Sequence, residues 1–440
     1  MEASRLSSSF RDPSGFLIKH EGLIYRQVNV SYKDNYDRLK DSGLYDSLVE
    51  KAWLIPHEEV SHSLNLSQDE IFYKMLFPEQ IPYISYPYEW CFSQLKDAAI
   101  LTLNIQMEAL NYGMVLKDAS SFNVQFLRGK PVFIDTLSFE TYHEGEPWVA
   151  YKQFCQHFLA PLALIANCDY RLIHLLIANI DGIPLDLVSR LLPFRTWFNY
   201  SLLAHLHLHA KSQKQFEDIG RSGAMRSKIK VSRTRYEGLM ASLLSGVKSI
   251  NYQHTNTEWG SYYDDTNYVD RSMSHKEEIV GNFLKRCSSQ GCKTAADFGA
   301  NTGKFSRLAA EQGFSVLSYD VDEVAVENNY QTTSANQEAS ILPLLLNLTN
   351  PSPALGWASK ERFSIIERLN VDVSIVLALI HHIAISNNVP LGLIAEFFST
   401  TCKLLIVEFV PKSDSQVERL LTTREDVFPD YTQQDFEETF

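Results

Sequence analysis

The sequence of 440 residues has only six cysteines, no long apolar run and no excess of basic residues. The cysteines are scattered through apolar stretches, which excludes a disulfide scaffold and a zinc site of paired CxxC motifs and predicts buried thiols. No run reaches the roughly 18 apolar residues of a membrane span, and the segment 1–15 lacks the apolar core of a signal peptide. We therefore expect a soluble, cytoplasmic protein without a membrane partner.

Basic charge is also scarce, since 53 acidic residues stand against 40 lysines and arginines and give a formal net charge of −13. Nucleic acid is therefore not expected as the main partner, because duplex binding needs an extended basic face. The chain is rich in apolar residues, at 45%, and is too long for a single compact core. These features predict at least two domains.

Patterning along the chain divides it into three regions. The first, 1–210, mixes short strand-like runs with helices, and its second half, 148–210, contains three or four helical patterns separated by Asp-Gly and Pro breaks. A clear helix is expected at 93–110, ending at a glycine stop. The second region, 211–257, begins with a run of eight basic and two acidic residues and is interpreted as a basic connector. Together these patterns predict an α+β N-terminal module followed by a linker.

The third region, 258–440, alternates apolar runs with helical patterns. Strands are expected at 294–299, 315–320, 341–346, 371–379 and 403–409. Such alternation is typical of a parallel, doubly wound sheet, so this region is predicted to be a Rossmann-like α/β domain.

A small-residue turn follows the first of these strands. Asp297 ends the strand, and Gly299, Asn301 and Gly303 lead into a helix. Such a turn lets the backbone approach a ligand closely, and the first amides of the helix supply donors. Asn301 stands where a glycine is commonest, and asparagine tolerates the positive φ that the turn requires. The turn therefore predicts a nucleotide-type binding site, and Asp297 is positioned to accept from an amino group.

Polar residues also end the next three strands. Asp320 follows Asp297 at the spacing expected of a carboxylate that binds a ribose diol. Asn347 ends the third strand, where an amide can meet an adenine edge, and His381 and His382 follow the fourth. Because open α/β sheets bind ligands at the carboxyl ends of their strands, these side chains are expected at one site.

The segments LKDASSFNVQFLRGKPVFIDTLSFE, YKQFCQHFLAPLAL, DFGANTGKFS, YDVDE, LALIHH and EFVPKSD resemble class I S-adenosylmethionine-dependent methyltransferases, within them a bacterial group of two-part proteins that includes the nodulation-protein type. The resemblance implies methyl transfer from S-adenosylmethionine to an oxygen or nitrogen of a small-molecule or carbohydrate acceptor, without a metal. It also implies residue roles: Asp297, Gly299 and Gly303 at the methionine end, Asp320 at the ribose and Asn347 at the adenine. Asn301, in the same turn, is a further candidate for cofactor binding. His381 and His382 are either structural histidines or a source of a general base for the acceptor, since imidazole titrates near neutrality.

The sequence departs from this family pattern at two places. Asn347 replaces a common aspartate, and the sequence stops at Phe440 without the sixth and seventh strands, so we expect five parallel strands with an unpaired edge. A dehydrogenase is the weaker alternative, because dinucleotide folds prefer a third glycine for close helix packing. A non-catalytic scaffold that retains the fold is another.

A second set of polar residues lies in the N-terminal module. Asp118, Asn123 and Asp135 have a spacing that resembles the catalytic loop and metal-binding residues of protein kinases and aminoglycoside phosphotransferases. The usual histidine, Phe-Gly pair and Gly-rich loop are missing, and Arg26 stands where a strand lysine is expected. A degenerate kinase-like module is one interpretation, and a helix with a β-hairpin is the other. In both cases the hairpin should bring the three residues into one cleft.

One further cluster precedes the first strand of the Rossmann-like domain. It consists of Trp259, Tyr262, Tyr263, Asn267 and Tyr268. Such a group is either part of a core or a lid over the cofactor.

Overall fold

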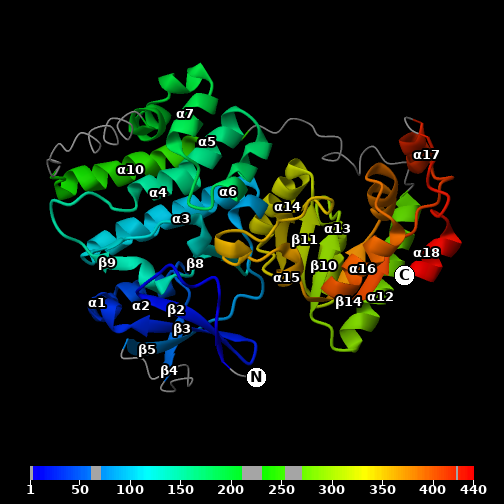
Figure 1. Cartoon of the computed structure of the whole chain (residues 1–440), viewed down its shortest axis with the longest axis horizontal. Coiled ribbons are helices and arrows are strands. Elements are labelled where there is room, and N and C mark those ends of the chain that lie inside the picture. Colours follow the sequence, from blue (N-terminus) through cyan, green and yellow to red (C-terminus); the bar gives the residue numbers. More distant parts are fainter. Residues whose placement is uncertain (1–2, 61–70, 211–229, 253–269, 423–424) are drawn as a thin grey trace.

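The computed structural model of the chain describes residues 3–60, 71–210, 230–252, 270–422 and 425–440. Figure 1 shows two parts side by side. One, coloured blue to green, is an antiparallel sheet with helices above it, and the other, yellow to red, is a parallel sheet between helices. This confirms the fold class predicted from the sequence, an α/β domain preceded by an α+β module.

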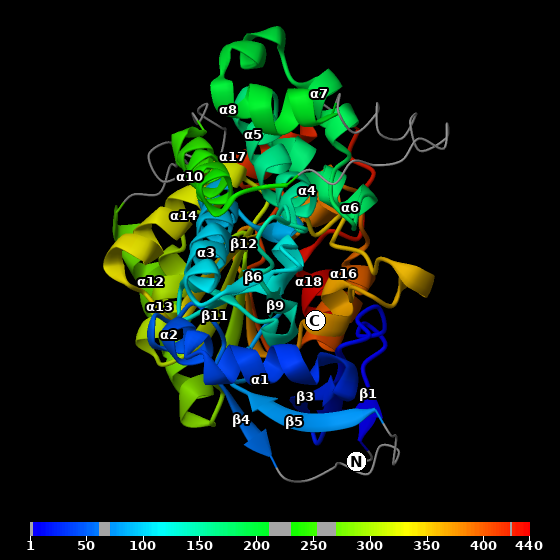
Figure 2. The ribbon, with the colours of Figure 1, turned by 90° about the vertical axis from the view of Figure 1, so that its left-hand side faces the viewer.

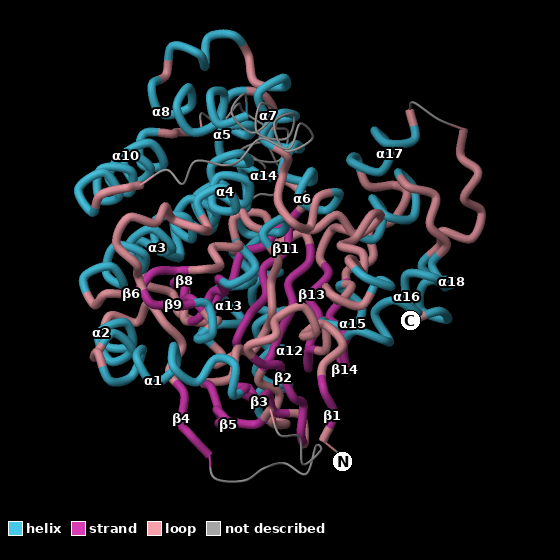
Figure 3. The backbone as a smooth tube through the Cα atoms, turned by 60° about the vertical axis from the view of Figure 1, so that its left-hand side comes forward, coloured by secondary structure: helices cyan, strands magenta, loops and turns pink. Residues whose placement is uncertain are grey.

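The N-terminal sheet has five antiparallel strands in the order β1-β2-β3-β5-β4 (Figure 3). They are β1 (Ser4–Arg5), β2 (Gly15–His20), β3 (Leu23–Asn29), β4 (His57–Val60) and β5 (Phe72–Pro78). Helices α1 (Lys33–Asp41) and α2 (Leu44–Glu50) connect β3 to β4. Val28 of β3 packs with Tyr36 of α1 in one buried cluster, so α1 covers a face of the sheet (Figure 2).

The long helix α3 (Phe92–Asn111) follows this sheet and ends before Gly113, as its periodicity predicted. Four short strands come next and pair antiparallel: β6 (Met114–Leu116) with β9 (Phe139–Thr141), and β7 (Val124–Leu127) with β8 (Lys130–Phe133). The predicted β7–β8 hairpin turns at Arg128 and Gly129, whose φ values of 52° and 75° suit a tight two-residue turn.

Short helices fill the predicted helical block 148–210. They are α4 (Tyr151–Phe154), a π-helical turn (Cys155–Leu159), α5 (Ala160–Asn167), α6 (Leu175–Ala178), α7 (Leu185–Leu191), α8 (Tyr200–Leu202) and a second π-helical turn (Leu203–His207). All six cysteines are free, and the prediction that they are buried is confirmed for Cys91, Cys155 and Cys287. It is wrong for Cys168, which is exposed just after α5, and Cys292 and Cys402 are only partly buried. No helix of the described ranges is both long and apolar enough to cross a membrane.

The connector predicted at 211–257 is in part a packed helix. Helix α10 (Arg233–Ser249) lies against α3 and buries Met240 and Leu243. Gln106 of α3 donates a hydrogen bond to the Tyr236 hydroxyl of α10 at 3.1 Å. The basic run at 211–235 led to the connector prediction, although Tyr236, Met240, Leu243 and Val247 have the spacing of a helix that buries one face. The other connector residues, 211–229 and 253–257, lie outside the described part.

The five predicted apolar runs form the C-terminal sheet, with all strands parallel and in the order β12-β11-β10-β13-β14. They are β10 (Thr294–Phe298), β11 (Ser315–Asp320), β12 (Ile341–Leu345), β13 (Val371–Val376) and β14 (Cys402–Val407). The chain runs outward from β10 to β12 and then returns to start β13 beside β10. This is the Rossmann-like arrangement, with its topological switch point between β10 and β13.

The helices around this sheet are α12 (Asp270–Ser289), α13 (Lys304–Glu311), α14 (Glu323–Asn336), α15 (Ile365–Arg368), α16 (Leu391–Thr401), α17 (Ser415–Leu421) and α18 (Gln433–Thr439). Helices α12 and α13 pack on one face of this sheet and α14 and α16 on the other, while α17 and α18 lie beside the turn after β13 and beside α16. Among the described strands, β14 pairs with β13 alone, which confirms the predicted five-stranded sheet with an unpaired edge.

The two parts of the chain share a buried contact. Arg368 of α15 forms an ion pair with Glu89, and only 5% and 2% of the two side chains are exposed. Arg368 also donates to the Tyr83 hydroxyl at 2.8 Å, and the backbone N–H of Ser93, in the first turn of α3, donates to Glu327 of α14 at 3.0 Å. One cluster of buried apolar residues continues through both parts, so the two parts are packed together as one body.

Candidate active site

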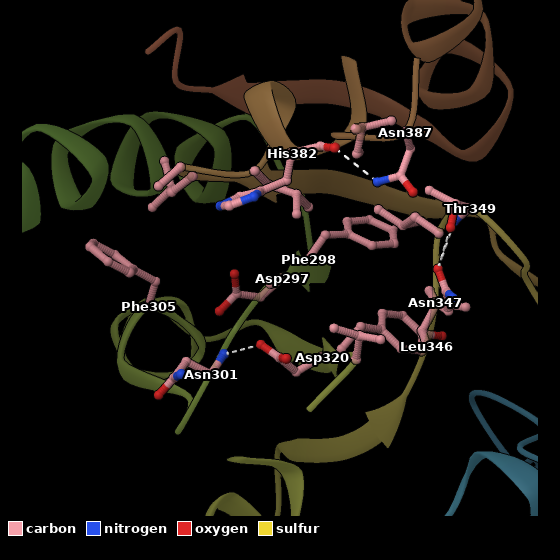
Figure 4. Close-up of a pocket in the computed structure, with 18 of the residues that line it drawn as sticks. Asp297, Phe298, Asn301, Phe305, Asp320, Leu346, Asn347, Thr349, His382 and Asn387 are labelled. Carbon is pink, nitrogen blue, oxygen red and sulfur yellow. Dashed lines mark hydrogen bonds between the residues drawn. The ribbon is translucent and has the colours of Figure 1, made fainter. Parts of the chain in front are cut away.

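A cavity of about 380 Å³ opens at the carboxyl ends of β10, β11 and β13 (Figure 4). This is the edge at which parallel α/β sheets bind ligands, because loops diverge there on either side of the switch point. The polar residues that line it are Lys276, Asp297, Asn301, Asp320, Asn347, Thr349, His382 and Asn387. Five of the predicted polar site residues are thus brought together at one cavity.

The turn after β10 has the predicted backbone conformation. Gly299, Asn301 and Gly303 have φ values of 72°, 50° and 84°, so Asn301 does adopt the left-handed conformation. Gly299 and Asn301 line the cavity, whereas Gly303 does not. Gly303 precedes α13, and a Cβ atom there would come within 2.4 Å of the Asn329 side chain on α14. Close helix packing therefore accounts for Gly303, and its contact with a cofactor stays a prediction.

Asp297 is 2% exposed and faces the cavity from the end of β10 (Figure 4). The Ser306 hydroxyl of α13 donates to its Oδ2 at 2.7 Å and orients the carboxyl group. Burial raises the pKa of Asp297 to about 7, and the nearby charge of Asp320 raises it further. The site therefore contains a carboxyl group that ionises near neutrality.

Asp320 ends β11 beside it and is 8% exposed. Its Oδ2 accepts from the backbone N–H of Asn301 at 2.7 Å, and its Oδ1 accepts from that of Asp322 at 2.9 Å. Burial raises the pKa of Asp320 to about 6 in spite of these bonds. The glycine turn and the second carboxylate are thus joined directly, which the sequence spacing alone did not reveal.

Asn347 lies in the loop after β12, is exposed, and lines the cavity. Its side-chain oxygen accepts from the backbone N–H of Thr349 at 2.9 Å and from the Thr349 hydroxyl at 2.7 Å. This bonding fixes the loop and occupies the amide oxygen. The predicted contact of Asn347 with an adenine ring remains a prediction.

The structure separates the two predicted histidines. His382 lines the cavity, but His381 is 3% exposed and does not. Burial lowers the pKa of His381 to about 3, and the neighbouring His382 lowers it further. His381 is therefore neutral near pH 7 and packed away from the cavity, so its placement does not support the predicted catalytic role.

Several residues that line the cavity escaped the sequence analysis, among them Thr349, Asn387 and two residues of α12. Lys276 of α12 lines the cavity, and its Nζ atom lies 2.6 Å from Oε2 of Glu408, just after β14. The same carboxylate oxygen accepts from the backbone N–H of Ala378 at 2.7 Å. Met273 also lines the cavity, one turn before Lys276. The spacing of Met273 and Lys276 on one helix face was the only available signal, and it is a weak one.

The predicted aromatic lid cannot be compared with the structure. Trp259, Tyr262, Tyr263, Asn267 and Tyr268 all lie outside the described residues.

The second predicted set also comes together, in the N-terminal module. Asn123 hydrogen-bonds the Asp118 side chain, and the charge of Asp135 acts on Asp118, whose pKa is raised mainly by burial. Arg26 of β3 lies 2.8 Å from Asp135 and 3.3 Å from Asp12. The predicted proximity of the three residues is confirmed, and Arg26 lies on a strand beside Asp135.

This cluster is organised around the arginine. No group of three or more His, Cys, Asp or Glu side chains in the described ranges is placed to hold a metal ion. The guanidinium of Arg26 instead satisfies Asp135 with a short ion pair, while the Ser138 hydroxyl donates to the same carboxylate. The kinase-like interpretation of the module stays a prediction.

Comparison with known proteins finds a relative that matches almost the whole chain. The chain is 32% identical to the nodulation protein NoeA of Rhizobium meliloti (strain 1021) over 439 residues, which are 98% of this chain and 90% of that protein. No family model matches the sequence.

Two solved structures show weaker similarity. The bifunctional kinase-methyltransferase WbdD matches 40% of this chain and 36% of its own, at 15% identity and a TM-score of 0.28. The magnesium protoporphyrin IX methyltransferase ChlM of Synechocystis PCC 6803, with bound SAH, matches 41% of this chain and 80% of its own, at 17% identity and a TM-score of 0.27. The fold assignment therefore rests on the strand order of this chain and not on these two structures.

Proposed function

The chain belongs to the family of the nodulation protein NoeA, and from this premise and the pocket geometry we propose that it is an S-adenosylmethionine-dependent methyltransferase. The acceptor is an oxygen or nitrogen atom of a small molecule or a sugar. The observation that carries the proposal is a pair of buried carboxylates, Asp297 and Asp320, that face one cavity from the ends of neighbouring parallel strands.

The chemistry of these two groups fits the polar ends of the cofactor. Burial raises the pKa of both carboxyls, so the surrounding protein stabilises their charged forms poorly. An ammonium group at Asp297 and a ribose diol at Asp320 would each supply the donors that favour the charged form. A nucleoside that carries an amino-acid end has both kinds of donor.

The remaining residues of the cavity supply alignment and a base. When bound, S-adenosylmethionine provides an electrophilic methyl group on a sulfonium. Holding an acceptor in line with that group accounts for much of the rate, since alignment replaces a bimolecular encounter. His382 is the cavity-lining side chain suited to take up the acceptor proton, because imidazole titrates near neutrality. Its neighbour His381 has no access to the cavity.

The size of the cavity favours a small acceptor. A volume of about 380 Å³ lies near the lower end of ligand sites. An adenosyl cofactor would fill most of it and leave room for a small acceptor only.

Calorimetry with S-adenosylhomocysteine, the demethylated product, tests the proposal. We expect the full chain to bind it, and Asp320→Asn to weaken binding by about 1–3 kcal/mol, because a charge-assisted acceptor is lost. Asp372→Asn is the matched control: Asp372 bonds the backbone N–H of Lys293 and Thr294 at the opposite end of the sheet. Binding that Asp320→Asn leaves unchanged would refute the site.

The reaction itself needs a separate measurement. The full chain is incubated with small-molecule extracts and cofactor labelled in its methyl group, and labelled products are identified by mass spectrometry. A labelled alcohol, amine or sugar supports the proposal. Binding of the cofactor with no transfer to any fraction would favour the non-catalytic scaffold instead.

A further inference from the structure

Three exposed aromatic side chains lie on one loop of the helical block. The 3-10 helical turn Phe194–Phe198 connects α7 to α8, and Phe194, Phe198 and the following Tyr200 are 74%, 80% and 78% exposed. The rings of Phe194 and Phe198 contact each other, with their centroids 5.6 Å apart. Single exposed apolar side chains are ordinary, whereas a group of them marks an interaction surface. We call residues 194–200 the aromatic tip.

The backbone of the aromatic tip is fixed from its inner side. Thr196 is 2% exposed, and its hydroxyl donates to the backbone oxygen of Pro193 at 2.7 Å. The same hydroxyl lies 2.9 Å from Nε2 of the buried His207, whose Nδ1 lies 2.8 Å from the hydroxyl of Ser189 on α7. The tip is therefore an ordered part of the fold that presents its aromatic rings to solvent.

The position and size of the tip argue against a second copy of this chain as its partner. Figure 1 and Figure 2 both show α7, which leads into the tip, at the outer end of the helical block. The three aromatic side chains expose roughly 450 Å² together, at about 200 Å² for a complete side chain. A stable protein interface needs about 800 Å² from each partner. The tip alone is too small for such an interface.

The charge around the tip is basic. Residues 187–210 include Arg190 and Arg195 but no aspartate or glutamate, in a chain whose net charge is −13. Both arginines are exposed, and Arg190 lies 3.4 Å from Asp186 in a pair too open to fix its charge. Asp169, which also lies nearby, forms a separate ion pair. The tip thus combines apolar rings with positive charge, which complements an anionic surface.

We propose that the aromatic tip binds the surface of an anionic lipid bilayer. Phe194 and Phe198 enter the boundary between headgroups and acyl chains, and Tyr200 lies at the level of the headgroups. Arg190 and Arg195 are attracted to the lipid phosphates. The expectation of a protein without a membrane partner rested on the lack of apolar spans, and a surface contact requires none.

Flotation of the full chain with lipid vesicles tests the inference. One set of vesicles is phosphatidylcholine alone, and the other is phosphatidylcholine and phosphatidylglycerol in equal parts. The unmodified protein should bind the mixed vesicles about ten- to thirty-fold more tightly, because two arginines lie at the contact. This preference should decrease as salt is added, since exposed charges are screened.

Two double variants separate the apolar from the charged contribution. Phe194→Ser with Phe198→Ser should weaken binding to mixed vesicles about ten-fold or more, because both rings lose their place in the lipid. Arg190→Gln with Arg195→Gln should lower it to the level of the neutral vesicles. Trp357→Ser is the matched control, since Trp357 is 75% exposed on the loop between β12 and α15, and it should bind like the unmodified protein.

Four outcomes would overturn the inference. The first two need no variant: the unmodified protein binds neither kind of vesicle, or it binds both equally. The third is a loss in Trp357→Ser as large as that of the phenylalanine pair, which would mean that any exposed aromatic ring adheres to lipid. The fourth is a dimer in sedimentation velocity that the phenylalanine substitutions dissociate, which would make the tip an interface between copies of this chain.

Discussion

The pKa of Asp297 predicts how ligand binding depends on pH. In the protein without ligand this pKa is about 7, raised by burial and by Asp320. An ammonium-bearing ligand favours the ionised form, so binding lowers the pKa and releases a proton below neutrality. Affinity should therefore fall as the pH decreases through 7. The affinity falls, and does not rise, at lower pH because a protonated Asp297 carboxyl group cannot form an ion pair with the ammonium group.

The magnitude follows from one proton. If only the ionised form binds and the pKa is about 7, S-adenosylhomocysteine should bind about 25-fold less tightly at pH 5.5 than at pH 7.5, or ~1.9 kcal/mol. Asp320, with a pKa of about 6, steepens the decline below pH 6. Unfolding caused by Asp297 does not explain this loss of affinity. The pKa of Asp297 is higher in the folded state than in the unfolded state, so its contribution to the stability of the fold increases as the pH falls.

Calorimetry in buffers of different ionisation enthalpy measures both the affinity and the protons released. We expect close to one proton released near pH 6.5 and fewer at pH 8. In Asp297→Asn the affinity should be weak and almost independent of pH between 7.5 and 6.5, because the titrating group is gone. An affinity that stays constant from pH 7.5 to 5.5 in the unmodified protein would show that Asp297 does not carry the ligand's ammonium group.

Two further substitutions test the packing around the site. Arg368→Ala should lower the free energy of unfolding by about 3–5 kcal/mol, because it leaves Glu89 buried without its ion-pair partner; a loss below about 1 kcal/mol in chemical denaturation would contradict a buried pair. Gly303→Ala should cost about 1–3 kcal/mol, since φ is 84° and the new Cβ meets the Asn329 side chain. Gly392→Ala is its control, with nothing within 4 Å of the added atom, and should be neutral or slightly stabilising in thermal unfolding; equal losses for both glycines would refute the packing argument.

The local pattern determined the C-terminal sheet and half of its site. Apolar runs marked all five strands. Strands β10, β11 and β13 are mostly buried, as inner strands of a parallel sheet are, whereas the edge strand β14 is only partly buried. The turn after Asp297 and the spacing to Asp320 were readable for a similar reason, since a close backbone approach restricts residue type at each position. The proximity of Asp118, Asn123 and Asp135 could also be predicted from the sequence, because a tight hairpin returns the chain to its start.

Tertiary packing decided the rest. The sequence does not distinguish His381 from His382, yet the turn after β13 buries His381 and places His382 in the wall of the cavity. Lys276 and Glu408 are 132 residues apart, and no local signal reports that α12 and the end of β14 meet at one pocket. Helix α10 could have been predicted from the spacing of its apolar residues, and only its packing partner α3 depended on the tertiary structure. Sequence patterns indicate which side chains of a segment are buried. Which other segment covers them, and which charged groups then lie next to each other, depends on how the whole chain folds.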